Sequence, residues 1–178
     1  MAEPRSFSIT VQVMAIIGGA ALAGTMMSLS LVTIPLFLDT NTQVSHMLRQ
    51  WHRLYSYGHV VMPGLSVGIC GLYLYKAMQK RQSQQCRALY TIAGLVTIAM
   101  IPFTLTVMWD TNQTLSSLAA DDIQKSGTID PLFGQVQELV ASWGRMHFVR
   151  SCFPLAGAAL GFTGVWEDFT NWPFSFRS

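Results

Sequence analysis

The sequence is poor in charged residues. Of its 178 residues only 11% are Asp, Glu, Lys or Arg, whereas 51% are hydrophobic. About a quarter of the residues of an ordinary soluble domain are charged, so this composition argues against a free cytosolic globule. The formal net charge is +2, and no block of Lys and Arg could neutralise several phosphates. We therefore expect no nucleic-acid partner.

Cysteine is scarce as well. Cys70, Cys86 and Cys152 are odd in number, lie apart and form no C-x-x-C pair. This pattern argues against a disulfide framework and against a thioredoxin-like redox site. We interpret all three as small apolar residues of the protein interior.

Long stretches without charge are what the sequence has instead. A helix needs ~20 mostly apolar residues to cross a bilayer, and such segments should be helical because lipid cannot satisfy exposed backbone groups. Four stretches qualify, at about residues 9–38, 54–75, 88–109 and 146–165. The first is too long for the apolar region of a signal peptide, so we interpret it as a retained span. The expected fold class is all-α, an integral membrane four-helix bundle that forms a single four-span domain over residues 1–178.

The basic residues between the second and third spans set the predicted orientation. Four of them lie there with no acidic residue: Lys76, Lys80, Arg81 and Arg87. Short loops rich in Lys and Arg face the cytoplasm, so both termini should be cytoplasmic. The opposite side would be the lumen of the endoplasmic reticulum or a related endomembrane.

The long loop between spans three and four is expected to be helical. Asp130 followed by Pro131 suits a helix start, with Asp as N-cap and Pro at the first helical position. We expect that helix to run into the fourth span as one long rod. A second short helix over residues 114–125 would cover the bundle on the lumenal side.

Small residues and prolines should shape the spans. Pairs of small residues at close-packing spacing are expected to let helix backbones approach each other: Ala20 and Gly24, Gly64 and Gly68, Gly157 and Gly161. A proline inside a helix bends it, and every span holds one: Pro35, Pro63, Pro102 and Pro154. For Pro35 a simple helix end is the alternative. Bent helices can enclose a cavity.

Ionisable residues within the spans are the main functional signal, because inserting each one costs ~2.5–3.5 kcal/mol. On the fourth span Trp143, His147 and Arg150 fall at i, i+4 and i+7, which is one helix face. His52, Tyr55 and His59 share a face of the second span in the same way, next to Trp51, and the third span ends with Met108, Asp110 and Asn112. Under the predicted topology these groups converge at the lumenal interface.

A purely structural interpretation of the same residues stays open. Trp51, Trp109 and Trp143 could form an interfacial aromatic belt. Arg150 could snorkel to the surface or pair with Asp110. A belt does not require His and Arg on one helix face, so the set as a whole favours a site.

Two segments resemble motifs of the anthrone oxygenase-like family, small four-span membrane proteins of fungal polyketide pathways. Residues 101–115, IPFTLTVMWDTNQTL, are similar to its proline-to-Thr-Asn motif, and residues 136–161, VQELVASWGRMHFVRSCFPLAGAALG, to its Trp-then-Arg signature. A weaker match runs from Gln50 to Pro63. Trp109-Asp110 departs from the family pattern, in which many members have Pro before the Thr-Asn pair.

The resemblance implies an anthrone oxygenase, a monooxygenase-type oxidoreductase that converts an anthrone to an anthraquinone with dioxygen and needs neither an organic cofactor nor a metal. Residue chemistry fits this activity. The anthrone methylene is acidic because its anion is an aromatic phenolate, so a base and a cation beside the oxyanion would yield a carbanion that reduces dioxygen. The resulting hydroperoxide loses water to form the quinone.

This hypothesis assigns catalytic roles to four residues. His147 is the expected base, with His52 as the substitute candidate, and Arg150 would stabilise the enolate oxygen. Asp110 and Asn112 would orient His147 or bind phenol groups. The predicted substrate-binding residues are Trp51, Tyr55, His59, Met108, Asn112 and Trp143, of which the tryptophans and the tyrosine would stack on the flat substrate.

Two other function classes remain alternatives. A haem- or copper-binding redox protein would use His52, His59 and His147 with Met62 or Met108. However, two His at i and i+7 lie ~10.5 Å apart along a helix, so one metal ion would need a ligand from another span. A non-catalytic scaffold or assembly partner would use the polar set for packing.

The partners expected on the main interpretation are an aromatic polyketide, dioxygen and the lipid bilayer, and a homo-oligomer is left open.

Overall fold

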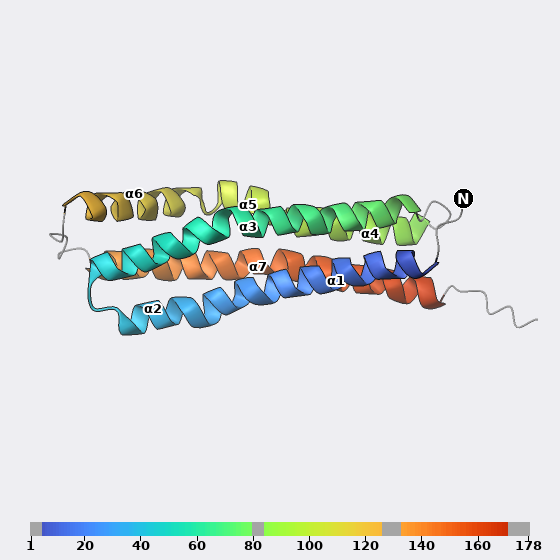
Figure 1. Ribbon diagram of the computed structural model, residues 1–178, viewed down its shortest axis with the longest axis horizontal. Coiled ribbons are helices and arrows are strands. Elements are labelled where there is room, and N and C mark those ends of the chain that lie inside the picture. The colour runs from blue at the N-terminus through green and yellow to red at the C-terminus, as the bar shows by residue number, and fades with distance from the viewer. Residues whose placement is uncertain (1–4, 80–83, 126–132, 171–178) are drawn as a thin grey trace, which may run out of the picture.

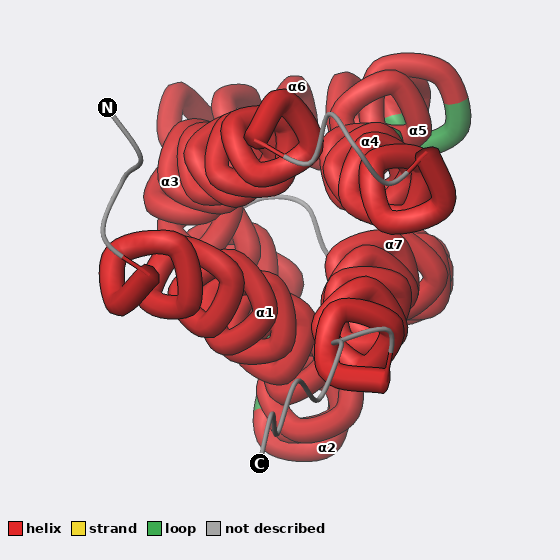
Figure 2. Tube along the Cα trace, turned by 90° about the vertical axis from the view of Figure 1, so that its right-hand side faces the viewer, coloured by secondary structure: helices red, strands yellow, loops and turns green. Residues whose placement is uncertain are grey.

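The computed structural model describes residues 5–79, 84–125 and 133–170. Within these ranges every regular element is a helix and there is no strand. Four segments are long and apolar enough to cross a membrane: Ile9–Thr40, Val44–Gln79, Gln84–Thr106 and Phe133–Asp168. Figure 1 shows them side by side in one elongated bundle, and the view along the bundle in Figure 2 places α1, α3, α4 and α7 at its four corners. The predicted all-α membrane bundle is confirmed.

The first span changes its helix type before Pro35. It consists of α1 (Arg5–Ser28), the π-helical segment η1 (Leu29–Thr33) and α2 (Ile34–Thr40). Pro35 has no backbone N–H to donate to the carbonyl of Leu31, and the Ile34 N–H bonds to the carbonyl of Leu29, five residues back. Pro35 therefore does not end its helix. It follows a widened turn, a feature that often marks functional sites.

The second and third spans differ at their prolines. The second span is the single helix α3 (Val44–Gln79), which is continuous through Pro63. The third span is interrupted at Ala99, three residues before Pro102, and so consists of α4 (Gln84–Ile98) and α5 (Met100–Thr106). Pro102 cannot donate to the carbonyl of Ile98, which explains a distortion at this position.

The described part of the loop between spans three and four is helical, as predicted. α6 (Trp109–Lys125) is longer than the short helix expected there, and α7 (Phe133–Thr170) is one uninterrupted helix that continues into the fourth span. Asp130 and Pro131, the predicted start of that helix, lie outside the described residues.

The bundle is longer than a bilayer is thick. α3 and α7 have 36 and 38 residues, which corresponds to ~54–57 Å at 1.5 Å per residue, against ~30 Å of hydrocarbon. Residues 53–76 of α3 and 145–167 of α7 begin and end with charged residues and hold only Arg150 between these ends. Each covers ~33–35 Å, so they match the hydrocarbon layer.

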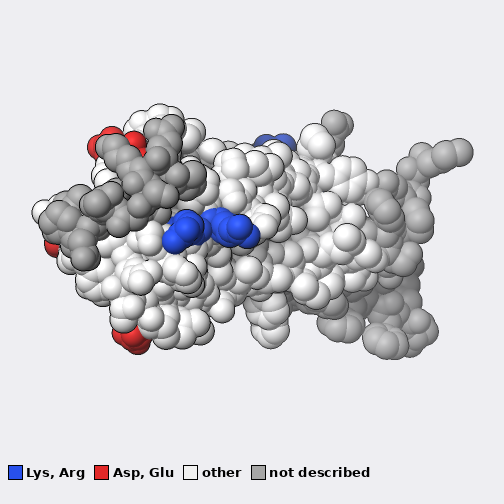
Figure 3. Space-filling view, turned by 60° about the vertical axis from the view of Figure 1, so that its left-hand side comes forward, with Lys and Arg blue, Asp and Glu red and all other residues white. Residues whose placement is uncertain are grey.

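The remainder projects beyond the layer on one side. This projecting end comprises α2, α6, residues 44–52 of α3 and residues 133–144 of α7, and Figure 1 shows α2 and α6 at the same end of the bundle. Acidic side chains gather at this end in Figure 3. It has its own core of Met47, Trp51, Met108, Leu115 and Val140, all fully buried. Packing of this core explains why the helices continue past the spans.

The small-residue pairs differ in what they contact. A Cβ on Gly161 would lie 2.6 Å from the Tyr73 ring, and one on Gly157 would lie 2.9 Å from the carbonyl oxygen of Ala93, so the predicted close packing of α7 is confirmed. The same prediction is wrong for Gly24, Gly64 and Gly68, where a Cβ would meet no atom within 4 Å. Spacing defines a flat helix face, but it does not determine whether another helix covers it.

Candidate active site

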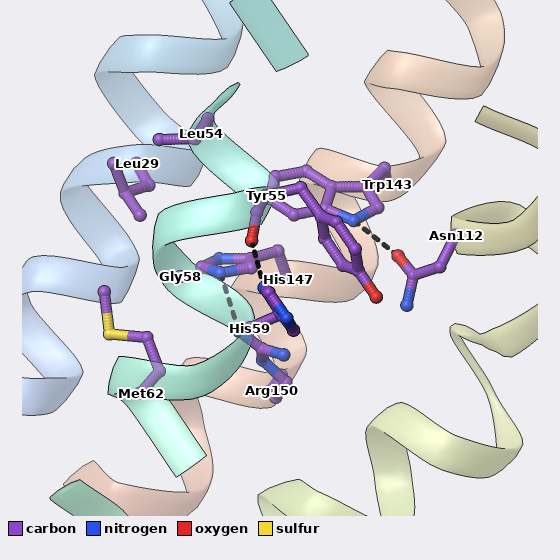
Figure 4. A pocket seen from close by; sticks show the side chains of 10 residues that line it. All are labelled: Leu29, Leu54, Tyr55, Gly58, His59, Met62, Asn112, Trp143, His147 and Arg150. Atoms are coloured by element: carbon purple, nitrogen blue, oxygen red, sulfur yellow. Dashed lines mark hydrogen bonds between the residues drawn. The ribbon is translucent and has the colours of Figure 1, made fainter. Parts of the chain in front are cut away.

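A small cavity lies at the membrane boundary next to the projecting end. Its lining comes from η1, α3, α6 and α7, and it includes six of the residues predicted from the sequence: Tyr55, His59, Asn112, Trp143, His147 and Arg150. Figure 4 shows these side chains converging from separate helices. Arg53 and Arg145 lie two residues before Tyr55 and His147, so the cavity sits close to where the hydrocarbon layer ends.

His147 is held by hydrogen bonds on both ring nitrogens. Its side chain is 2% exposed. Nε2 lies 3.0 Å from Nη2 of Arg150, and Nδ1 lies 3.1 Å from Oγ of Ser30. Because a guanidinium can only donate, Nε2 must accept. The imidazole is therefore neutral with its proton on Nδ1, which donates to Ser30, whose hydroxyl donates in turn to the Met26 carbonyl at 3.3 Å.

Arg150 is a buried cation with no carboxylate beside it among the residues that the structure describes. It is 6% exposed, and its Nη1 donates to Oγ1 of Thr104 at 3.1 Å. Its Nε has no hydrogen-bond partner within the described ranges. No carboxylate in the described part of the chain pairs with it, and Asp110, the partner considered above, is exposed. A buried charge that makes only neutral contacts is costly, so this guanidinium is suited to receive an anion.

Aromatic rings form one wall of the site. Trp143 stacks on His147 with ring centroids 4.6 Å apart and donates from Nε1 to Oδ1 of Asn112 at 2.9 Å. Tyr55 stacks between Trp51 and His59, at 5.1 and 5.4 Å. Asn112 thus contacts Trp143, and Trp143 in turn stacks on His147. Flat apolar walls of this kind suit a planar aromatic ligand.

Four predicted site residues do not line the cavity. Trp51 and Met108 are fully buried in the core of the projecting end. His52 and Asp110 are exposed on α3 and α6. The belt interpretation describes Trp109, which is 49% exposed, but not Trp51 and Trp143, which are 0% and 4% exposed.

Sequence reasoning missed two hydroxyl groups that support the site. Ser30 and Thr104 bind His147 and Arg150, but a hydroxyl in an apolar span usually bonds to its own helix backbone and gives no signal. The only hint for Ser30 was its place five residues before Pro35.

Leu29, Leu54, Gly58 and Met62 complete the cavity lining. In the described ranges, no three His, Cys, Asp or Glu side chains are grouped to hold a metal ion.

Comparison with known proteins identifies the family. Residues 51–160 match the family described as "Anthrone oxygenase". The chain is 43% identical to the anthrone oxygenase dmxR16 of Cryptosporiopsis sp. (strain 8999), over 89% of this chain and 90% of that protein. It is 46% identical to the anthrone oxygenase nsrD of Aspergillus novofumigatus, over 85% of this chain and 90% of the relative.

A relative with a different name is the monooxygenase hypC of Dothistroma septosporum, 39% identical over 86% of this chain and 81% of that protein. No solved structure matches the chain. The family match covers more than half of the chain, and the relatives match it over most of their own length. The chain belongs to the anthrone oxygenase family.

Proposed function

We propose that this protein is a membrane-bound anthrone oxygenase, which converts an anthrone to an anthraquinone with dioxygen in aromatic polyketide biosynthesis. The observation that carries the proposal is the Arg150 guanidinium, which is buried without a carboxylate from the described residues and lies 3.0 Å from the neutral ring of His147. A base and an oxyanion partner thus stand side by side beneath an aromatic wall. The names of the relatives support this chemistry.

The first step is removal of a methylene proton. At rest the lone pair of His147 Nε2 accepts from Arg150. A substrate oxygen on which negative charge develops attracts the guanidinium more strongly than a neutral ring does. Arg150 then moves its Nη2 donor to that oxygen, and Nε2 becomes free to accept the proton. The products are an imidazolium and an enolate held by the guanidinium.

Dioxygen is the electron acceptor. The enolate carbon transfers an electron pair to dioxygen and forms a C–O bond, which yields a peroxide anion. The imidazolium of His147 returns its proton, and a hydroperoxide results. Loss of the second C–H proton then breaks the O–O bond and leaves a carbonyl and water. One CH₂ and one O₂ give one C=O and one H₂O, so the balance needs no further reductant.

The network around His147 supports one tautomer during this cycle. Ser30 accepts from Nδ1 at 3.1 Å and so leaves the lone pair on Nε2, toward the cavity. The stacked Trp143 fixes the plane of the imidazole ring. We assign the base to His147 rather than to the exposed His52 for these reasons.

We further propose that the protein lies in the endoplasmic reticulum or a related endomembrane with both termini in the cytoplasm. The supporting observation is charge asymmetry, since the span 2–3 connection is basic and the projecting end carries acidic groups. The projecting end would then be lumenal. A protease-protection assay on tagged termini tests this orientation, and protected termini would overturn it.

The experiment for the main proposal supplies emodin anthrone to membranes that contain only this protein. Dioxygen uptake and quinone absorbance are followed against empty membranes, because anthrones also oxidise spontaneously in air. Uptake above that background is expected for the wild type and not for His147→Ala or Arg150→Ala. Full turnover by both folded variants would refute the assignment.

A further inference from the structure

The cavity beside His147 is too small for its proposed substrate. Its volume is about 20 Å³, which is room for one water molecule. Pockets for drug-sized ligands have ~300–1,000 Å³. A tricyclic ring system must therefore be received elsewhere before the cavity opens to it.

A groove of the required size lies next to the cavity. It runs between α1 and α3 and has a volume of about 640 Å³. Met62 lines both the groove and the cavity, so the two are neighbours on either side of this side chain. In the first span, Thr25 of α1 lines the groove one helical turn before Leu29 of η1, which lines the cavity. Figure 4 shows Leu29 and Met62 on the side of the cavity where α1 lies.

The groove is apolar and opens to the outer surface of the bundle. The side chains on its rim are half or more exposed, at 57% for Met14, 54% for Val61 and 51% for Leu65. Its lining holds no charged group, and the hydroxyl of Thr25 is already bonded to the Ala21 carbonyl at 2.9 Å. Val61 and Leu65 lie within residues 53–76 of α3, the segment that matches the hydrocarbon layer. Met14 and Thr25 lie within the first candidate span, Ile9–Thr40. The occupant must be uncharged and must come from the acyl-chain region.

Glycines create the space. Gly64 and Gly68 line the groove, and a Cβ on either would meet no atom within 4 Å. They therefore keep the groove open instead of packing against a neighbouring helix. Each would accept a larger side chain without a clash, and that side chain would occupy the groove.

We propose that this groove is the lateral entrance of the enzyme, where a flat, uncharged tricyclic substrate docks from the hydrocarbon layer. Met62 is the side chain that separates the docked molecule from His147 and Arg150. An unbranched thioether changes rotamer easily, so Met62 can move aside without displacement of a helix. The identity of the docked molecule rests on the proposed function. The existence of the groove does not depend on that function.

Kinetics of a filled groove test the entrance. The double variant Gly64→Leu/Gly68→Leu places two side chains in it, and Leu is a better helix former than Gly. We expect KM for the anthrone to rise at least ~10-fold, equivalent to ~1.4 kcal/mol of binding, with kcat within about twofold of the wild type because the cavity residues are untouched. The matched control is Gly71→Leu, an exposed glycine of α3 outside the groove. An unchanged KM, or an equal rise in the control, would overturn the proposal.

A binding readout separates this inference from the proposed function. Benzophenone, an apolar aromatic ketone that reacts with nearby C–H bonds on illumination, is added to the protein in lipid nanodiscs. Cross-links should concentrate on Met14, Val61 and Leu65, persist in Gly71→Leu and disappear in the double variant. Labelling of the groove without any anthrone turnover would refute the proposed function and leave the groove intact. Labelling spread evenly over all lipid-facing helices would refute the groove.

Discussion

Replacing Arg150 by Lys tests whether the planar guanidinium, and not merely a positive charge, is required. Arg150 donates at the same time to His147 at 3.0 Å and to Thr104 at 3.1 Å. A lysine ammonium is a point charge on a flexible stem and cannot reproduce this fork. We expect the loss of one hydrogen bond to a charged group, ~1.5–3 kcal/mol. At 1.36 kcal/mol per decade this is a ~10- to 150-fold lower kcat/KM.

The assay is initial dioxygen uptake at several anthrone concentrations, corrected for empty membranes. Folding of the variant is verified by size-exclusion chromatography in detergent. Arg145→Lys is the matched control, because Arg145 is exposed on the same helix and does not line the cavity. If kcat/KM of Arg150→Lys stayed within twofold of the wild-type value, the proposal that the guanidinium must donate to His147 and Thr104 at the same time would be wrong.

Three further substitutions test the base, its support and the packing of the bundle. His147→Ala should lower kcat at least ~100-fold, as loss of a general base does, whereas His52→Ala should remain within about twofold; the reverse pattern in dioxygen uptake would move the base to His52. Ser30→Ala removes the acceptor of the Nδ1 proton and should lower kcat by ~5- to 150-fold, the kinetic equivalent of ~1–3 kcal/mol, with partial rescue in Ser30→Thr; an unchanged kcat and pH profile would exclude this positioning role. Gly161→Val forces a side chain against Tyr73 and should destabilise the bundle by ~1–3 kcal/mol, measured as a lower melting temperature in detergent; an unaltered melting temperature would contradict the close packing of these helices.

The spans were predictable because hydropathy determines them, and the long rod of α7 was predictable from the helix start expected before it. The core that holds the first turns of this rod was not predictable. α7 continues from the membrane to Phe133, although its first three turns lie outside the apolar run. Those turns are held by the core of the projecting end, where Val136 and Val140 are at most 1% exposed. Contacts with α2 and α6 create this core, and a single segment of sequence does not reveal them.

The site was predictable where one helix face carried it. Trp143, His147 and Arg150 recur at helical spacing, and the structure buries all three. His52 and Asp110 are also ionisable and near the same level, but they are exposed. Which side of a helix faces its neighbours depends on rotation of the whole helix in the bundle, and the spacing of polar residues on α3 did not determine it.

The central claim is that His147 and Arg150 act together on an anthrone and dioxygen. Incorporation of isotopically labelled dioxygen by membranes bearing the wild-type chain tests it most directly, with mass spectrometry of the quinone as the readout. We predict one labelled oxygen atom in the new carbonyl, formed faster than in empty membranes, and the empty-membrane rate for folded His147→Ala and Arg150→Ala. Label that enters at the wild-type rate in both variants would contradict the account.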